Sequence, residues 1–93
     1  MWFVYVLRHD ESSDIYIGVS FDVERRLKAH NDGRNPSTRR KSGRWDVLYY
    51  EAYQTKESAF ERENRLKSHG KAKQELLKRL NYNSLNKKGA GNV

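Results

Sequence analysis

Two short runs of aromatic and β-branched residues near the start of the chain constrain its fold most. Residues 2–7 (WFVYVL) and 15–19 (IYIGV) have the composition of β-strands, and the seven residues between them are all polar. A connection of this length favours an antiparallel hairpin, because parallel strands need a crossover of about a dozen residues or more. Side chains alternate between the two faces of a strand, so Tyr16 and Gly18 share a face, and the phenols of Tyr5 and Tyr16 can lie together on one face of the hairpin.

The remaining sequence predicts one further strand and three helices. Ser20 or Asp22 can cap a helix that extends to about His30, where an Asn-Asp-Gly sequence stops it. The later elements are predicted as a strand at 45–53, a helix at 56–68 capped by Thr55, and a helix at 71–80.

The order of these elements, β-β-α-β-α-α, indicates the fold class. It is satisfied by an α+β domain with a three-stranded antiparallel sheet flanked by about three helices. A chain of 93 residues has the length of one domain, which we expect at residues 1–80. Residues 81–93 are polar and contain glycine, so we expect a disordered tail there.

The chain is strongly basic, with 19 Lys and Arg residues against 12 Asp and Glu and a formal net charge of +7. A basic excess of this size in a small domain attracts polyanions, nucleic acid first and an acidic membrane second. The sequence has no apolar stretch long enough to span a bilayer, no lipidation motif and no signal peptide. We therefore expect a cytoplasmic protein that associates with nucleic acid and with no membrane.

Several kinds of catalytic site are excluded by what the sequence lacks. There is no cysteine, which excludes disulfides, thiolate zinc sites and cysteine nucleophiles. The zinc-protease, P-loop and dinucleotide-binding motifs are absent as well. The three histidines share no metal-ligand spacing, and we expect His9 and His69 to face solvent.

Five basic residues and no acidic residue occupy the predicted loop between residues 34 and 44. Such side chains bind the phosphate backbone of nucleic acid without reading its sequence, although a loop made basic for solubility is the alternative. The residues expected to bind nucleic acid are Arg34, Arg39, Arg40, Lys41 and Arg44 of this loop, together with Lys67. Trp45 and Tyr53 would stack on unpaired bases if they are exposed.

A carboxylate interrupts the apolar stripe of the helix predicted at 56–68. Ala59, Glu63 and Leu66 recur at helical spacing, so Glu63 lies on the face that should meet the core. An inward carboxylate is unfavourable unless it is paired or holds a metal ion. A salt bridge with Arg26, or an edge position that reaches solvent, would explain it as well as a metal site does. With no soft ligands in the chain, a metal here would be a hard cation such as Mg²⁺ or Mn²⁺.

Two further pairs of residues carry groups suited to phosphate chemistry. Arg26 and His30 lie one helical turn apart, where a guanidinium can bind a phosphate through two hydrogen bonds and an imidazole can move a proton. The hydroxyls of Tyr5 and Tyr16 can order a water molecule or contact a phosphate. Each pair also has a plainer explanation, namely a solvated helix flank for the first and half-buried core residues for the second.

The residues singled out above together resemble the GIY-YIG nuclease superfamily. The segment Phe3-Val4-Tyr5 stands in the place of the GIY triplet, and Tyr16-Ile17-Gly18 matches the YIG triplet outright. Arg26 lies ten positions beyond Tyr16, where the family's helix arginine is expected. His30 lies four positions further, where members of the family carry His or Tyr.

The resemblance extends to the later helix and covers about residues 2–80. Its segment 62–67 looks like the family's metal-binding helix, with Glu63 as the single acidic ligand. The similarity is closest to the small stand-alone branch, which is similar to the N-terminal nuclease module of an excinuclease. The chain departs from the pattern at Val19, where some members have a lysine, and the family's late asparagine has only a loose counterpart in Asn81, to which we assign no role.

The resemblance implies a metal-dependent DNA endonuclease that hydrolyses phosphodiester bonds at a single-metal site. Glu63 would hold one Mg²⁺ or Mn²⁺ ion, and Arg26 would bind the scissile phosphate. Tyr5 would orient or deprotonate the attacking water, His30 is the rival base or a donor to the phosphate, and Tyr16 would help to position water or phosphate. Because the pKa of a free phenol is near 10, a tyrosine base requires nearby cations that lower it.

The implied partner is DNA, single-stranded or structured, with RNA as an alternative. We expect no small-molecule cofactor, and a monomer or a weak homodimer. Two other classes of function stay open at this point, a non-catalytic nucleic-acid-binding module of the same fold and a protein-interaction domain. The sequence does not distinguish among DNA repair, restriction, mobility and DNA uptake as the biological role.

Overall fold

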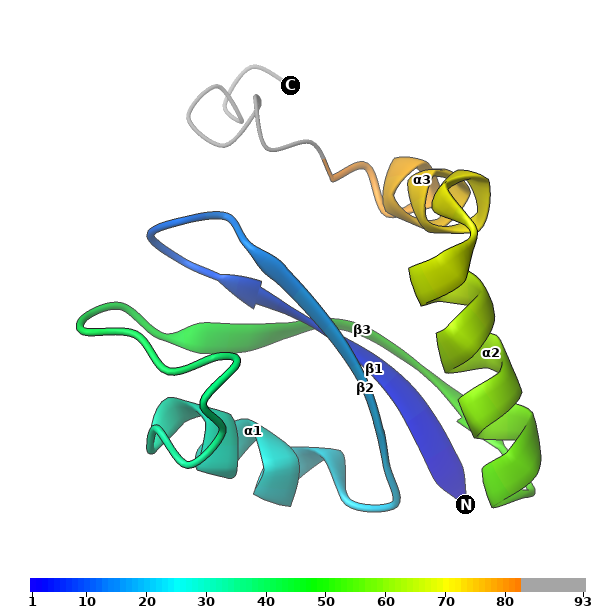
Figure 1. Cartoon of the computed structure of the whole chain (residues 1–93), viewed down its shortest axis with the longest axis horizontal. Helices are drawn as coiled ribbons and strands as arrows, with labels where there is room; N and C mark the ends of the chain where they lie inside the picture. Colours follow the sequence, from blue (N-terminus) through cyan, green and yellow to red (C-terminus); the bar gives the residue numbers. More distant parts are fainter. Residues whose placement is uncertain (83–93) are drawn as a thin grey trace.

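The computed structural model of the protein describes residues 1–82, which form a three-stranded antiparallel sheet and three helices (Figure 1). The elements in chain order are β1 (Trp2–His9), β2 (Ile15–Ser20), α1 (Val23–Asn31), β3 (Trp45–Tyr53), α2 (Lys56–Ser68) and α3 (Gly70–Arg79). This order confirms the β-β-α-β-α-α arrangement and the α+β fold class predicted from the sequence. None of the helices within residues 1–82 has the length and apolar character needed to cross a membrane.

Side-chain caps start the two helices that follow strands. Asp22 Oδ1 accepts a hydrogen bond from the backbone N–H of Arg25 at 3.0 Å, and Thr55 Oγ1 accepts one from the N–H of Ser58 at 3.1 Å. After α1 the chain turns at Gly33, whose φ of 78° lies in the left-handed region that glycine adopts without strain. These local signals fix the ends of α1 and the start of α2, and so decide which side chains each helix turns toward the sheet.

β1 is the central strand of the sheet, with β2 on one side and β3 on the other, both antiparallel to it. In this register Tyr5 lies opposite Gly18 of β2 and Tyr50 of β3. A bulge between Val6 and Leu7 shifts the pairing with β3. Helix α1 covers one face of the sheet, and α2 with α3 covers the other (Figure 1). Because β2 is at the edge of the sheet, side chains from the two faces can approach one another around this strand.

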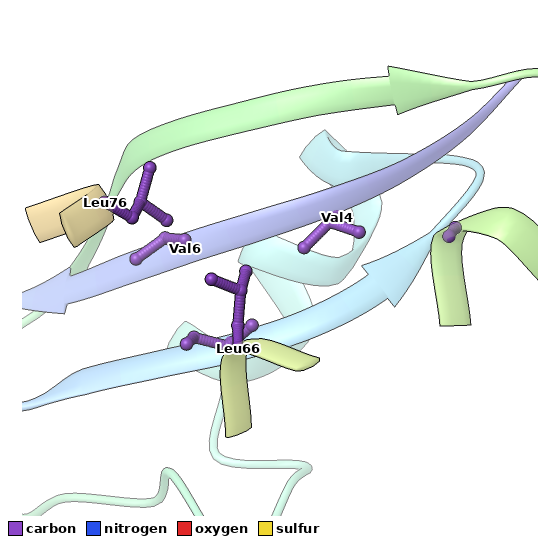
Figure 2. Close-up of a cluster of buried hydrophobic side chains, with 6 residues drawn as sticks. Val4, Val6, Leu66 and Leu76 are labelled. Atoms are coloured by element: carbon purple, nitrogen blue, oxygen red, sulfur yellow. The ribbon is translucent and has the colours of Figure 1, made fainter. Parts of the chain in front are cut away.

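The alternation of side chains along β1 divides the core into two clusters. The cluster on the α2 and α3 face contains Val4, Val6, Ile17, Ala59, Leu66 and Leu76 (Figure 2). The cluster on the α1 face contains Tyr5, Leu7 and Trp45, with Tyr16, Val23, Leu27 and Val47 packed against it. The expected placement of Tyr5 and Tyr16 on one face of the hairpin is therefore confirmed.

The segment expected to be a tail starts with two residues that bond back to the domain. The backbone N–H of Asn81 donates to the carbonyl of Lys78, and that of Tyr82 donates to the carbonyl of Leu77, both at 2.9 Å. The Tyr82 hydroxyl donates to the carbonyl of Ser13 in the turn between β1 and β2, at 2.6 Å. The rest of the expected tail, residues 83–93, lies outside the described residues.

Candidate active site

A chain of hydrogen bonds connects three buried side chains on the α1 face of the sheet. The Tyr5 hydroxyl lies 3.0 Å from His30 Nε2, and His30 Nδ1 lies 2.7 Å from Thr38 Oγ1. The Thr38 hydroxyl donates in turn to the backbone carbonyl of Asn35 at 3.3 Å. The side chains of Tyr5, His30 and Thr38 are buried, so these bonds form away from bulk water. The chain thus joins β1 to the end of α1 and to the loop that follows.

The chain of hydrogen bonds has a direction. All three bonds form together only when the single hydroxyl hydrogen of Thr38 goes to the Asn35 carbonyl and Thr38 Oγ1 accepts from the Nδ1–H of His30. Nε2 is then the unprotonated ring nitrogen, and it accepts the hydrogen bond of the Tyr5 hydroxyl. The proton of the phenol therefore points at a basic nitrogen.

Gly18 gives the Tyr5 phenol its path to the edge of the sheet. A Cβ atom built on Gly18 would lie 2.6 Å from the Tyr5 hydroxyl oxygen and 2.7 Å from Cζ, closer than real contacts allow. Any side chain at this position would displace the ring. The glycine of the YIG triplet therefore has a steric function, because it leaves open the space that the tyrosine of the opposite strand occupies.

Tyr16 and Arg26 border the Tyr5–His30 pair. The Tyr16 ring centroid lies 4.7 Å from that of His30 and 6.2 Å from that of Tyr5. The Arg26 guanidinium lies within hydrogen-bonding reach of the Tyr5 hydroxyl, and its charge acts on Tyr5 and on His30. Arg26 is exposed, so the cation is available to an anion that arrives from solvent. The four residues predicted on β1, β2 and α1 are thus brought together.

The surroundings shift the pKa values of Tyr5 and His30 in opposite directions. Burial raises the pKa of Tyr5 and outweighs the hydrogen bond and charge of Arg26, which lower it. Burial, and then the charge of Arg26, lowers the pKa of His30, so the imidazole is neutral at pH 7. The expectation that nearby cations bring the Tyr5 pKa down is therefore wrong for the net effect. A free phenolate is not available at neutral pH, and the acceptor of a proton in this pair is His30.

Glu63 reaches the same region from α2, on the opposite face of the sheet. Its side chain is 17% exposed and pairs with Lys67, one helical turn later, with 3.0 Å between Nζ and Oε2. The pairing with Arg26 that we considered from the sequence is not formed. The Glu63 charge acts on Tyr5 and raises its pKa, and the Lys67 ammonium lies 5.7 Å from the centroid of the Tyr16 ring. The carboxylate is therefore linked through Lys67 to the Tyr16 side of the tyrosine pair.

The donor set around Glu63 suits a hard divalent cation. No group of three or more His, Cys, Asp or Glu side chains that could enclose a metal occurs within residues 1–82. Mg²⁺ does not need such a cage, since it commonly binds one or two carboxylates and completes its shell with water and substrate phosphate. A half-buried carboxylate with a displaceable ammonium partner fits this mode of binding.

The residues of the basic loop divide into paired and unpaired groups. Arg34 pairs with Asp32 at 3.6 Å, and Arg40 pairs with Asp14 at 2.8 Å while it lies over the Trp45 ring. The loop residues Arg39, Lys41 and Arg44 are exposed and form no ion pair with another residue of the described part of the chain.

The predictions that Trp45 could stack on a base and that His9 faces solvent are both wrong. Trp45 is 4% exposed and donates its indole N–H to the Thr38 carbonyl, so it is not available to stack on a base. His9, expected to face solvent, is buried against Trp45, and its Nδ1 accepts hydrogen bonds from the backbone N–H groups of Glu11 and Ser12. The other histidine expected to face solvent, His69, is exposed.

Thr38 is the member of the hydrogen-bond chain that the sequence did not reveal. It stands eight residues after His30 in a polar loop and has no periodic relation to it. Its contact with His30 depends on the path of the whole loop. The nearest available signal was its position between a helix that carries a candidate histidine and a strand that starts with tryptophan.

A second polar cluster lies on the other face of the sheet and ties α2 to β3. Glu51 accepts hydrogen bonds from the hydroxyls of Tyr49 and Tyr53 and from Nε of Arg62 at 2.7 Å. Burial tends to raise the pKa of Glu51, but the three hydrogen bonds outweigh it and hold this pKa below its ordinary value. The two hydroxyls and Nε of Arg62 all donate to the one carboxylate, which is the arrangement of a structural link between elements.

Comparison with known proteins matches the GIY-YIG catalytic domain to residues 1–76 of the chain. A UPF0213 protein of Haloquadratum walsbyi is 31% identical over 75 residues, which make up 81% of this chain and 83% of that protein. A UPF0213 protein of Aeromonas hydrophila is 36% identical over 76 residues, or 82% of this chain and 55% of its own length. The solution NMR structure of a UPF0213 protein from Bacillus halodurans has a TM-score of 0.52 and 31% identity, covering 86% of this chain and 85% of that chain. The matched region contains every residue of the hydrogen-bond chain and the carboxylate beside it.

Proposed function

The chain belongs to the family of GIY-YIG catalytic domains, and we propose that it is a metal-dependent endonuclease that hydrolyses phosphodiester bonds in DNA. The observation that carries this proposal is the 3.0 Å hydrogen bond between the Tyr5 hydroxyl and the unprotonated Nε2 of His30, formed beside an exposed arginine and a half-buried carboxylate. Binding alone needs no such directed proton acceptor. Hydrolysis does, because the attacking water must lose a proton as it bonds to phosphorus.

Tyr5 and His30 act together as the base. The water oxygen bonds to phosphorus as the bond from phosphorus to the leaving oxygen breaks, and the leaving oxygen takes a proton from solvent water. The proton of the attacking water passes to the Tyr5 oxygen while the phenol proton passes to His30 Nε2, which leaves a neutral phenol and an imidazolium. The high pKa of Tyr5 is no obstacle in this scheme, since no free phenolate forms. The bond from His30 Nδ1–H to Thr38 Oγ1 holds the ring in the required tautomer and orientation.

Arg26 and Tyr16 position the substrate. The guanidinium can bind the scissile phosphate through two hydrogen bonds and stabilise the negative charge that grows on it. The Tyr16 ring packs beside His30. Its hydroxyl lies 3.5 Å from the side-chain nitrogen of Asn35. Tyr16 thereby limits where the water and the phosphate can sit.

Glu63 would hold one Mg²⁺ or Mn²⁺ ion. When bound, such an ion supplies positive charge to the phosphate and to the leaving oxygen. The chain's own part is to present the carboxylate at the edge of β2 and to release it from Lys67, whose ammonium is then free to contact a neighbouring phosphate. This accommodates the sequence-based assignment of Lys67 to nucleic-acid binding.

Cleavage of labelled DNA in Mg²⁺ or Mn²⁺ tests the proposal. We expect Glu63→Gln and Arg26→Ala to reduce the cleavage rate at least about 100-fold, the usual contribution of a group that stabilises charge at the reacting phosphate. The matched controls are Glu61→Gln on the same helix and Arg25→Ala beside Arg26, both exposed, and we expect them to cut like the wild type.

The outcomes separate the remaining alternatives. If Glu63→Gln and Arg26→Ala cut as well as the wild type, the site is assigned wrongly. If the wild type binds DNA in a salt-dependent manner but cuts no substrate with either metal, the chain is a non-catalytic binding module of the same fold. Binding that depends on neither salt nor DNA would indicate a protein-interaction domain.

A further inference from the structure

A long groove lies between the turn that joins β1 to β2 and the exposed side of α3. Its volume is about 1010 Å³, and its walls include Arg40, Lys73, Gln74, Lys78 and Tyr82. None of these residues except Arg40 belongs to the nucleic-acid-binding set predicted from the sequence. The groove is therefore a surface to which the sequence analysis assigned no function.

The groove continues toward the candidate active site. A smaller hollow of about 250 Å³ is lined by Tyr16, Lys67 and Lys73, and Lys73 and Ile15 line both hollows. Tyr16 packs against His30, and Lys67 pairs with Glu63. A chain-like ligand that has a phosphate at Arg26 can therefore pass Tyr16 and Lys67 and enter the groove beside Lys73.

We propose that this groove binds a single strand of nucleic acid that continues from the scissile phosphate. The inference rests on the proposed nuclease function and names the form of its substrate. It assigns phosphate contacts to Lys73 and Lys78 and a stacking contact to Tyr82. None of these three residues takes part in the chemistry described above.

The charges that line the groove favour a polyanion. Its cations are Arg40, Lys73 and Lys78, and its one carboxylate, Asp14, is paired with Arg40 at 2.8 Å. Within residues 1–82, Lys73 and Lys78 form no ion pair. Both ammonium groups are therefore available to phosphates, and each contact would release counterions from the strand.

The size of the groove fits a short length of one strand. Pockets of about 300–1,000 Å³ enclose a single drug-sized ligand, so this volume accommodates a few nucleotides in a row. The hairpin turn forms one wall and α3 the other, and the Tyr82 hydroxyl bonds across to the Ser13 carbonyl at 2.6 Å.

The remaining polar groups suit recognition without sequence preference. Tyr82 offers an aromatic face, and a base of any kind can stack on such a face. The amides of Gln74 and Asn81 line the same groove and can both donate and accept hydrogen bonds. Lysines that track the backbone beside a stacking platform are the combination found in grooves for single strands.

Fluorescence anisotropy with labelled oligothymidylate and oligouridylate, in EDTA so that no cleavage occurs, tests the proposal. We expect Lys73→Ala and Lys78→Ala each to weaken binding about fivefold at 100 mM salt and to reduce the slope of log affinity against log salt by about 0.7, the value for one phosphate contact of a single strand. Tyr82→Ala should weaken binding without changing the slope. Lys71→Ala is the matched control, because Lys71 lies on the same helix but lines a different hollow, together with Arg62 and Arg65.

Each result supports or overturns the groove assignment separately from the nuclease. If Lys73→Ala and Lys78→Ala bind the oligonucleotides like the wild type while Glu63→Gln still abolishes cleavage, the groove is assigned wrongly and the nuclease function stands. If these lysine variants lose single-strand binding but the wild type cuts nothing, the groove assignment stands alone. A loss of affinity that is equal for blunt duplex and single strands would overturn the assignment to one strand. The two oligonucleotides distinguish DNA from RNA as the preferred ligand.

Discussion

The substitution Gly18→Ala tests most directly how the two strands of the hairpin build the site. The new Cβ would stand 2.6 Å from the Tyr5 hydroxyl oxygen and 2.7 Å from Cζ. The backbone of Gly18 is not in the left-handed region, so the cost arises from this contact and not from the dihedral angles. Forcing one carbon into a packed core costs about 1–3 kcal/mol, and losing the hydrogen bond from Tyr5 to His30 costs about 1 kcal/mol more. We expect the free energy of unfolding to fall by about 2–4 kcal/mol.

Urea denaturation followed by tryptophan fluorescence measures this change, because Trp45 is buried in the same cluster as Tyr5. The matched control is Gly70→Ala, where a Cβ would meet nothing within 4 Å. Gly70 begins α3, and alanine is the better helix former by up to about 1 kcal/mol, so this control should be unchanged or slightly stabilised. At a temperature where both variants are folded, Gly18→Ala should lose cleavage and Gly70→Ala should retain it.

A double-mutant cycle assigns the effect to the Tyr5 ring. Tyr5→Phe removes the oxygen that lies closest to the new methyl group, so Gly18→Ala should cost less in that background, with a coupling of at least about 0.5 kcal/mol. The steric argument is refuted if Gly18→Ala is as stable and as active as Gly70→Ala, or if its cost is the same with Phe at position 5.

Three further predictions concern the hydrogen-bond chain and the structural link on the other face. Thr38→Val removes the acceptor of the Nδ1–H of His30, and because a hydrogen bond contributes about 1 kcal/mol we expect kcat to fall about fivefold at unchanged KM, with recovery in Thr38→Ser. The pKa of His30 is lowered by burial and by Arg26, so the unfolded chain binds a proton near pH 6.5 that the folded chain does not. The free energy of unfolding, measured by urea titration, should therefore decrease as the pH falls below about 6.5, and this decrease should be smaller in His30→Gln; an equal slope would contradict the burial argument. Glu51→Gln leaves Arg62 without its charged acceptor and should lower the free energy of unfolding at pH 7 by about 1.5–3 kcal/mol without affecting cleavage. The pKa of Glu51 in the folded protein is lowered, so the difference in unfolding free energy between wild type and Glu51→Gln should shrink as the pH falls through this pKa. A difference that is constant with pH would show that the charge is not involved.

The fold was predictable because its signals are local. The caps at Asp22 and Thr55 and the glycine after α1 are each read from a few neighbouring residues, and each appears in the structure. The polar hairpin connection appears too, but it has five residues and not seven, because β1 continues to His9. Other boundaries also differ: β2 ends at Ser20 and not at residue 19, α3 ends at Arg79 and not at residue 80, and α3 begins at Gly70 and not at residue 71. Glycine there breaks α2 but tolerates the first position of the next helix, where no intrahelical N–H partner is required.

The site was predictable only as a set of residue types. Periodicity indicated that Glu63 turns inward, but not that its partner is Lys67, because Arg26 was an equally reasonable cation until the two faces of the sheet were placed. The sequence also did not show the direction of the Tyr5 pKa shift, because this direction depends on the balance between burial and the nearby Arg26. Thr38 could not have been found, since its contact with His30 depends on the path of a loop without periodic structure.

The strand order explains why these groups meet where they do. Tyr5 is on the central strand, where a side chain is enclosed on both sides by neighbouring strands, yet the proposed reaction requires its hydroxyl to reach the substrate phosphate. The neighbour toward the open edge is β2, and the residue directly opposite on that strand is Gly18. With no side chain at that position, the phenol lies against Gly18 on the α1 face, where it bonds to His30, and the charge of Glu63 on α2 acts on it from the other face. In the proposed reaction, His30 on one face and Glu63 on the other act at the same edge strand, and the glycine opposite Tyr5 leaves the phenol its place there. A substitution that adds a single carbon at Gly18 should therefore affect both the stability and the chemistry.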